Sequence, residues 1–270
     1  MGHGGHHTGV QAPPLDRPTL RHRILSGEVL LGAWASLDSP ISAEILARAG
    51  FDWVVVDLEH GAATEASLLA HLTAIEAGGA AAIVRPQSAE RLRIGRALDL
   101  GAEGVVVPRL DTAEQAREAV TFLRYPPAGA RGVALLTRGA RLGTVGHGDV
   151  AGLNEGILGI VQVESRGALE AVDEIAAIDG VDVLFVGPAD LSHALGVPGR
   201  FDDPAYQAAL RRVVEACRRH GKAAGILLYD HPAYAPHLEL GFTFMGLGAD
   251  VSMVAQGARA ALAAARSHLP

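Results

Sequence analysis

One repeated unit accounts for most of this sequence: a short, nearly continuous apolar run, a polar turn, a segment with helical spacing, and often a glycine. Runs that are apolar throughout, rather than at alternate positions, are typical of parallel strands covered on both faces. Eight strands alternating with helices predict a single (βα)₈ TIM barrel of the α/β class. The predicted strands are Leu31–Ala35, Trp53–Leu58, Ala81–Val84, Gly104–Val107, Ile157–Val163, Val183–Val186, Ala224–Leu228 and Phe242–Leu247.

Between these runs, apolar residues recur at the spacing of an amphipathic helix. An open doubly wound sheet would need a phosphate-binding turn of the form GxGxxG or GxxxxGK[ST], and neither occurs. One connection, from about 125 to 155, is too long for an ordinary loop and predicts a functional excursion or a subunit contact. The predicted helices are Ile41–Ala49, Glu65–Ala77, Ala89–Leu100, Ala113–Leu123, Ala168–Ile178, Pro204–His220, Ser252–His268 and, with a less regular pattern, Pro232–Leu240.

Composition narrows the class of protein. The 270 residues, 49% of them hydrophobic, suit one barrel domain over residues 19–270, and residues 1–18 lack periodicity and predict a mobile tail. A net charge of −7 without a basic run argues against nucleic acid as a partner, and no apolar stretch is long enough to span a membrane. Cys217 is the sole cysteine, which suits a packing role in a reducing cytoplasm.

Polar residues collect where four predicted strands end. The ends of parallel barrel strands meet at one opening, here called the mouth, where barrel enzymes place their active sites. Taken singly, each residue has an ordinary explanation as a turn or loop-capping residue, but their convergence predicts a site. The residues are Asp57, Glu59 and His60 after the second strand, Arg85 after the third, Gln162 and Glu164 at the fifth, and Gly187, Pro188, Ala189 and Asp190 after the sixth.

The residue types indicate metal chemistry. Two carboxylates, Glu164 and Asp190, without cysteine or HxxxH, suit a hard ion such as Mg²⁺ or Mn²⁺ with open coordination positions. The turn before Asp190 could present backbone amides to a substrate carboxylate. The only lysine, Lys222, precedes the seventh strand and belongs at the opposite end of the barrel. A Schiff-base aldolase is therefore excluded, and a metal-stabilised enolate of a 2-oxo acid remains.

With these motifs the sequence resembles the HpcH/HpaI family of metal-dependent pyruvate aldolases, over roughly residues 31–252. The ordered set that carries the resemblance is Asp57-Leu58-Glu59-His60-Gly61, Arg85-Pro86, Gly104 to Pro108, Tyr125-Pro126-Pro127 with Arg131-Gly132, Gln162-Val163-Glu164 and Gly187 to Ser192.

The resemblance implies an aldolase that makes or cleaves 4-hydroxy-2-oxo acids through pyruvate, with Mg²⁺, Mn²⁺ or Co²⁺ on Glu164 and Asp190. It implies that Arg85 contacts the keto oxygen and that His60, oriented by Asp57 or a nearby acid such as Glu59, is the general base. Gln162 and the turn Gly187-Pro188-Ala189 would line the substrate. It further implies a hexamer that exchanges its last helix between subunits.

Three further positions bear on the resemblance. Asp99 matches a family position that can approach a site across a subunit interface. Arg138 fits a position able to bind the far end of the acceptor aldehyde, and a subunit-contact role explains it equally well. Arg109 stands where the family more often has Met.

Two alternatives stay open. A lyase or synthase acting on acyl-CoA thioesters such as malyl-CoA or citramalyl-CoA shares the enolate chemistry, but it would want a basic surface path that this chain does not clearly show. A non-catalytic barrel kept for assembly or ligand binding would have no need of His60, Arg85, Glu164 and Asp190 together.

Overall fold

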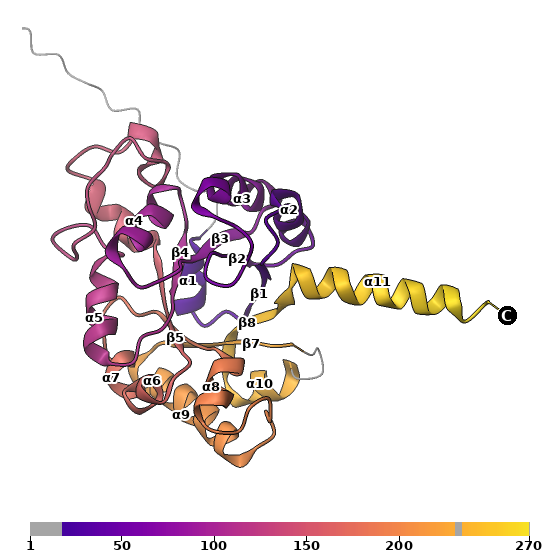
Figure 1. Ribbon diagram of the computed structural model, residues 1–270. Helices are drawn as coiled ribbons and strands as arrows, with labels where there is room; N and C mark the ends of the chain where they lie inside the picture. The colour runs from indigo at the N-terminus through magenta and orange to yellow at the C-terminus, as the bar shows by residue number, and fades with distance from the viewer. Residues whose placement is uncertain (1–17, 230–233, 270) are drawn as a thin grey trace, which may run out of the picture.

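The computed structural model describes residues 18–229 and 234–269, and in this part of the chain eight parallel strands close into a barrel in sequence order (Figure 1). Closure comes from β8 pairing with β1, where Leu30 lies opposite Phe244. All eight predicted strands are confirmed, each end within two residues. Their bounds are β1 Leu30–Ala35, β2 Trp53–Asp57, β3 Ala81–Arg85, β4 Gly104–Val107, β5 Leu158–Val163, β6 Val183–Val186, β7 Ala223–Leu227 and β8 Phe242–Ala249.

The predicted helices are largely confirmed. The predicted helix 168–178 is instead two short helices, because Ala171 leaves helical geometry with ψ of 8°. Positions 232 and 233 of the predicted helix 232–240 lie outside the described residues, as do His3, His6 and His7 of the predicted tail. The helices are α2 Pro40–Arg48, α3 Glu65–Gly78, α4 Arg91–Asp99, α5 Ala113–Thr121, α6 Arg166–Glu170, α7 Val172–Ala176, α9 Pro204–His220, α10 Tyr234–Leu240 and α11 Asp250–Arg266.

The pattern missed short elements. Helix α1, Leu20–Leu25, spans too few residues for periodicity to stand out; Thr19 caps it, and Leu20 and Ile24 bury against the barrel interior. Helix α8, Pro188–Ala194, is longer than the short helical turn that the sequence predicts before Asp190. The long connection contains two 3₁₀ segments, η1 Arg138–Gly143 and η2 Val150–Gly156.

Aromatic side chains fill the inside of the barrel. Trp53 stacks on Phe244 with ring centroids 4.3 Å apart, and Phe185 meets both edge-on. Gly32 makes room for this stack, since a Cβ there would lie 2.0 Å from the Trp53 ring. Because the interior between the described strands is filled with side chains, it holds no open channel, and a ligand can bind only at an end of the barrel.

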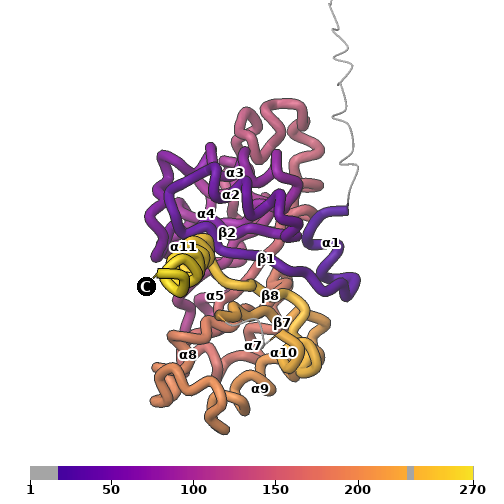
Figure 2. The backbone as a smooth tube through the Cα atoms, turned by 90° about the vertical axis from the view of Figure 1, so that its right-hand side faces the viewer, coloured from indigo at the N-terminus to yellow at the C-terminus, as the bar shows by residue number. Residues whose placement is uncertain are grey.

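Helix α11 departs from this arrangement. Figures 1 and 2 both show it projecting from the barrel, and Asp250, at its first position, is its one buried residue. Among the described residues, no helix has both the length and the apolar character needed to cross a bilayer.

Candidate active site at the barrel mouth

Arg85 lies at the centre of the mouth, held by two carboxylates. Its Nε and Nη2 donate to the two oxygens of Asp57 at 2.9 and 2.7 Å, and its Nη1 lies 3.3 Å from Glu59 Oε2. The guanidinium also lies 4.5 Å from the ring centroid of Trp34, one residue before the end of β1. All three charged groups are buried or nearly so, and a pair of parallel hydrogen bonds fixes the plane of the guanidinium.

Asp57 also shapes the loop that carries His60. Its Oδ1 accepts hydrogen bonds from the backbone amides of Glu59 and His60 at 3.1 and 3.2 Å. The His60 ring itself does not contact Asp57: its Nε2 lies 3.8 Å from Glu59 Oε1, and the side chain is 62% exposed. Glu59 is therefore the acid that lies near the imidazole, while Asp57 contacts Arg85 and the loop backbone.

Glu164, just beyond the end of β5, is held from two sides. Its Oε1 accepts a hydrogen bond from the Arg109 amide at 2.7 Å, and Oε2 accepts a short one from Gln162 Nε2. Burial raises the pKa of Glu164, the Arg109 hydrogen bond opposes the rise, and the charges of Glu59 and Asp190 add to it. The charges of Glu59, Arg85 and Asp190 all act on Glu164, so these four predicted residues lie near one another at the mouth.

The oxygens present suit a hard divalent ion. Asp190 is exposed in the first turn of α8, Glu164 is buried behind it, and the buried Gln162 Oε1 has no hydrogen-bond partner. No group of three or more His, Cys, Asp or Glu side chains in the described residues is arranged to hold a metal. Two carboxylates would therefore leave most coordination positions to water or substrate, as catalytic Mg²⁺ sites do.

The turn before Asp190 is tightly packed. Gly187 donates its amide to Val163 O at 3.2 Å, and a Cβ on Gly187 would lie 2.8 Å from Gln162 Nε2 and 3.2 Å from Glu164 Oε2. The Gly187 amide is thus not free, and Pro188 has none. Of the predicted turn, only the Ala189 amide, together with that of Asp190, remains at the uncapped start of α8.

Sequence reasoning missed two residues at the mouth. Trp34 supports Arg85 from β1. Tyr229 follows β7; burial raises its pKa, the Asp190 charge raises it further, and the Arg85 charge opposes the rise. Both stand at or just beyond strand ends, so the rule that found Glu164 would have found them had apolar and aromatic residues been included.

Two predicted residues are not brought to the mouth of their own chain. Asp99 ends α4 and pairs with Arg131 at 3.0 Å. Arg138 pairs with Glu76 near the end of α3 and reaches Leu100 O at 3.4 Å. Barrel helices run back from the mouth, so both residues lie toward the opposite end, with the long connection.

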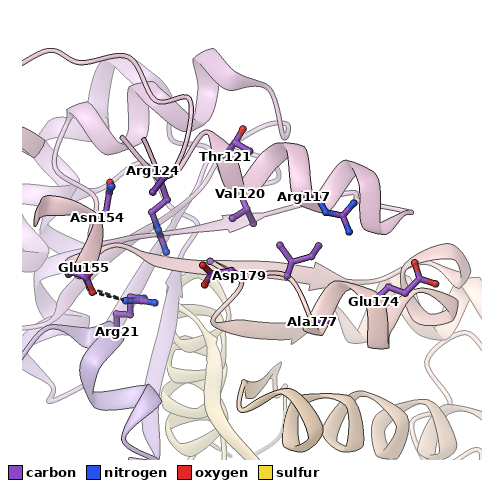
Figure 3. A pocket seen from close by; sticks show the side chains of 13 residues that line it. Arg21, Arg117, Val120, Thr121, Arg124, Asn154, Glu155, Glu174, Ala177 and Asp179 are labelled. Carbon is purple, nitrogen blue, oxygen red and sulfur yellow. Dashed lines mark hydrogen bonds and ion pairs between the residues drawn. The ribbon is translucent and has the colours of Figure 1, made fainter. Parts of the chain in front are cut away.

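Lys222 also lies at that opposite end, as predicted, and its Nζ donates to Ile178 O at 3.3 Å. A cavity of about 540 Å³ lies on the same side. Arg21 and Arg124 point into it (Figure 3). Its lining includes none of the predicted site residues, so the chemistry of the mouth does not extend to it.

Comparison with known proteins agrees with this geometry. Residues 30–257 match the family described as HpcH/HpaI aldolase/citrate lyase. The chain is 44% identical over 246 residues to a hydroxypyruvate/pyruvate aldolase of Deinococcus radiodurans, covering 89% of this chain and 87% of that one. It is 41% identical over 226 residues to a 5-keto-4-deoxy-D-glucarate aldolase of Klebsiella pneumoniae, covering 84% and 88%.

A solved structure shows the same similarity. An HpcH/HpaI aldolase/citrate lyase family protein from Burkholderia cenocepacia superposes with a TM-score of 0.86 at 38% identity, covering 92% of this chain and 98% of that one. The chain therefore belongs to the HpcH/HpaI aldolase/citrate lyase family and is a carbon–carbon lyase of the aldolase type.

Proposed function

We propose that this aldolase joins pyruvate to an aldehyde, or cleaves the resulting 4-hydroxy-2-oxo acid, with a divalent ion held by Glu164 and Asp190. The observation that supports the proposal is that Arg85, held by Asp57, and Asp190 are both close enough to Glu164 for their charges to act on it. A bound Mg²⁺, Mn²⁺ or Co²⁺ would act as a Lewis acid on the keto group and favour the enolate.

Arg85 would stabilise the negative charge that develops on the keto oxygen. Its orientation is set before substrate arrives, because Asp57 fixes two of its nitrogens and Trp34 supports its face. Such preorganised donors need no rearrangement as charge develops, which is why they contribute strongly to catalysis. Ala189, at the start of α8, would receive the carboxylate of the 2-oxo acid together with Gln162.

His60 would move the proton. In cleavage, the imidazole removes the proton of the C4 hydroxyl, the C3–C4 bond breaks, the aldehyde leaves, and the pyruvate enolate takes a proton at C3. Synthesis reverses these steps. An exposed ring beside Glu59 can exchange protons with solvent and still be oriented, as a general acid–base group requires.

The test is to assay metal-stripped protein on a panel of 4-hydroxy-2-oxo acids and to measure pyruvate release as Mg²⁺, Mn²⁺ or Co²⁺ is added back. Glu164→Gln and Asp190→Asn should lose both turnover and Mn²⁺ binding by calorimetry while keeping the circular dichroism of the wild type. His60→Ala should bind Mn²⁺ normally but lose cleavage. Pyruvate release that persists unchanged in excess chelator would contradict the metal mechanism.

We further propose a hexamer in which α11 packs on a neighbouring subunit. The exposed apolar residues Val251, Val254 and Leu262 on α11, and Ile41 and Ile45 on α2, support this assembly. Asp99 and Arg138 lie away from the mouth of their own chain, and in this assembly they would approach a neighbour's mouth.

A further inference from the structure

Arg109 follows β4 in an unusual backbone conformation. Its φ is 57°, in the left-handed region that glycine adopts more easily than any L residue. This conformation directs the Arg109 amide to Glu164 Oε1 at 2.7 Å. Glycine would provide the same amide at lower conformational cost, so the hydrogen bond alone does not account for an arginine at this position.

The side chain of Arg109 is exposed, and within the described residues its guanidinium makes no hydrogen bond or ion pair. It does lie near Glu59. Burial raises the pKa of Glu59, while the charges of Arg85, His60 and Arg109 act against that rise. Arg109 therefore belongs to the mouth: its amide lies 2.7 Å from Glu164 Oε1, and its charge is close enough to act on Glu59.

Among the described residues of the mouth, Arg109 is the arginine whose guanidinium makes no ion pair or hydrogen bond. Arg85 is held by Asp57 and Glu59, and Glu164 and Asp190 would face a divalent ion. Arg138, the sequence-predicted residue for the acceptor, is engaged with Glu76 and Leu100 O away from this mouth.

We propose that Arg109 binds a carboxylate at the far end of the acceptor aldehyde, so that the enzyme prefers aldehydes that carry an acid group. The proposal rests on the aldolase function above. The guanidinium presents a planar set of N–H donors that matches a carboxylate in two parallel hydrogen bonds. An aldehyde that approaches the pyruvate enolate from the open side of the mouth passes Arg109.

The experiment compares two acceptors of similar shape, succinic semialdehyde and its neutral methyl ester, in condensation with pyruvate in the presence of Mn²⁺. Arg109→Met and Arg109→Gly both remove the guanidinium; the glycine variant also suits the left-handed backbone and keeps the amide to Glu164. Arg109→Lys retains the charge. Arg138→Met is the matched control at the other candidate position.

We expect Arg109→Met and Arg109→Gly to lower kcat/KM for the semialdehyde about 10- to 100-fold, mainly through its KM, the usual range for losing a hydrogen-bonded charge. Turnover of the methyl ester should change less than about twofold, and Arg109→Lys should recover part of the loss. Equal losses on both acceptors would overturn the proposal, as would discrimination that disappears in Arg138→Met but persists in the Arg109 variants. Methyl ester turnover by the wild type tests the aldolase function separately, because this acceptor carries no carboxylate.

Discussion

At the scale of the residue, the mouth is built from buried charges that neutralise one another. Arg85 is flanked by Asp57 and Glu59, and each of these side chains is about 90% buried or more. Removing one member of such a cluster lowers the stability of the fold more than replacing the whole cluster with apolar residues does, because its charged partners stay buried without compensation.

We therefore expect Arg85→Met to lower the free energy of unfolding by about 3–5 kcal/mol and to abolish turnover. The double variant Arg85→Met/Asp57→Asn should recover part of the stability, since one stranded carboxylate is neutralised, but none of the activity. Urea unfolding and the pyruvate assay measure the two effects. Unchanged stability in the single variant would show that the cluster is not buried in solution.

The pKa of Glu164 is raised above its ordinary value of 4.5, first by burial and then by the charges of Glu59 and Asp190. Without metal, the folded state then holds this proton more tightly than the unfolded chain does. Glu164 therefore lowers stability as pH rises from about 4.5 through the raised pKa. In chelator, the Tm of Glu164→Gln should exceed that of the wild type by a margin that grows across this window and then levels off.

Differential scanning fluorimetry from pH 4 to pH 8 would measure this margin, on the order of a few degrees. Adding Mn²⁺ at neutral pH should reverse the order, because only the wild type binds the ion strongly and binding stabilises the folded state. A margin independent of pH would contradict the raised pKa.

At the scale of the element, Asp250 joins the first turn of α11 to the loop after β1. Its carboxylate accepts hydrogen bonds from the Ser36 amide at 2.8 Å, the Leu37 amide at 3.3 Å and Ser42 Oγ at 2.9 Å, and it is 2% exposed. One side chain thus sets the direction in which α11 leaves the barrel.

Asp250→Ala should lower the free energy of unfolding by about 2–3 kcal/mol, because several buried donors lose their acceptor. Glu44→Ala, which removes an exposed partner of Arg48 within α2, is the control and should cost under about 0.5 kcal/mol. Urea unfolding would compare the two. Equal small effects would mean that α11 is positioned by other contacts.

At the scale of the whole molecule, packing on the barrel does not account for the stability of α11. A helix of 17 residues with one buried residue would be marginal in water without a partner. Contact with another subunit would bury its apolar side chains.

Light scattering coupled to size exclusion should therefore give a mass several times the 28.0 kDa of one chain, about sixfold for the proposed hexamer. Deleting residues 251–270 should reduce that mass and leave the barrel folded by circular dichroism. A full-length protein that elutes as a monomer, or a deletion that keeps the full mass, would contradict the proposed role of α11.

Periodicity predicted every strand because each buries both faces, so the apolar runs are uninterrupted and local. It joined α6 and α7 into one predicted helix. It also missed α1, since a helix of six residues leaves too short a pattern and Leu20 and Ile24 are buried only by contact with distant strands. The position of Arg85, Glu164 and Asp190 at or after strand ends likewise predicted a site, because the topology of a parallel barrel brings the ends of all its strands to one mouth.

The sequence by itself determined the barrel and the residue types at its mouth. It also excluded a Schiff-base mechanism, because the one lysine precedes a strand instead of following one. Only the tertiary structure decided which partners those residues take: that Asp57 holds Arg85 rather than the His60 ring, that Gly187 gives its amide to Val163, and that Arg138 turns to Glu76. Side-chain pairing depends on distances between strands and loops far apart in sequence. No local pattern encodes those distances.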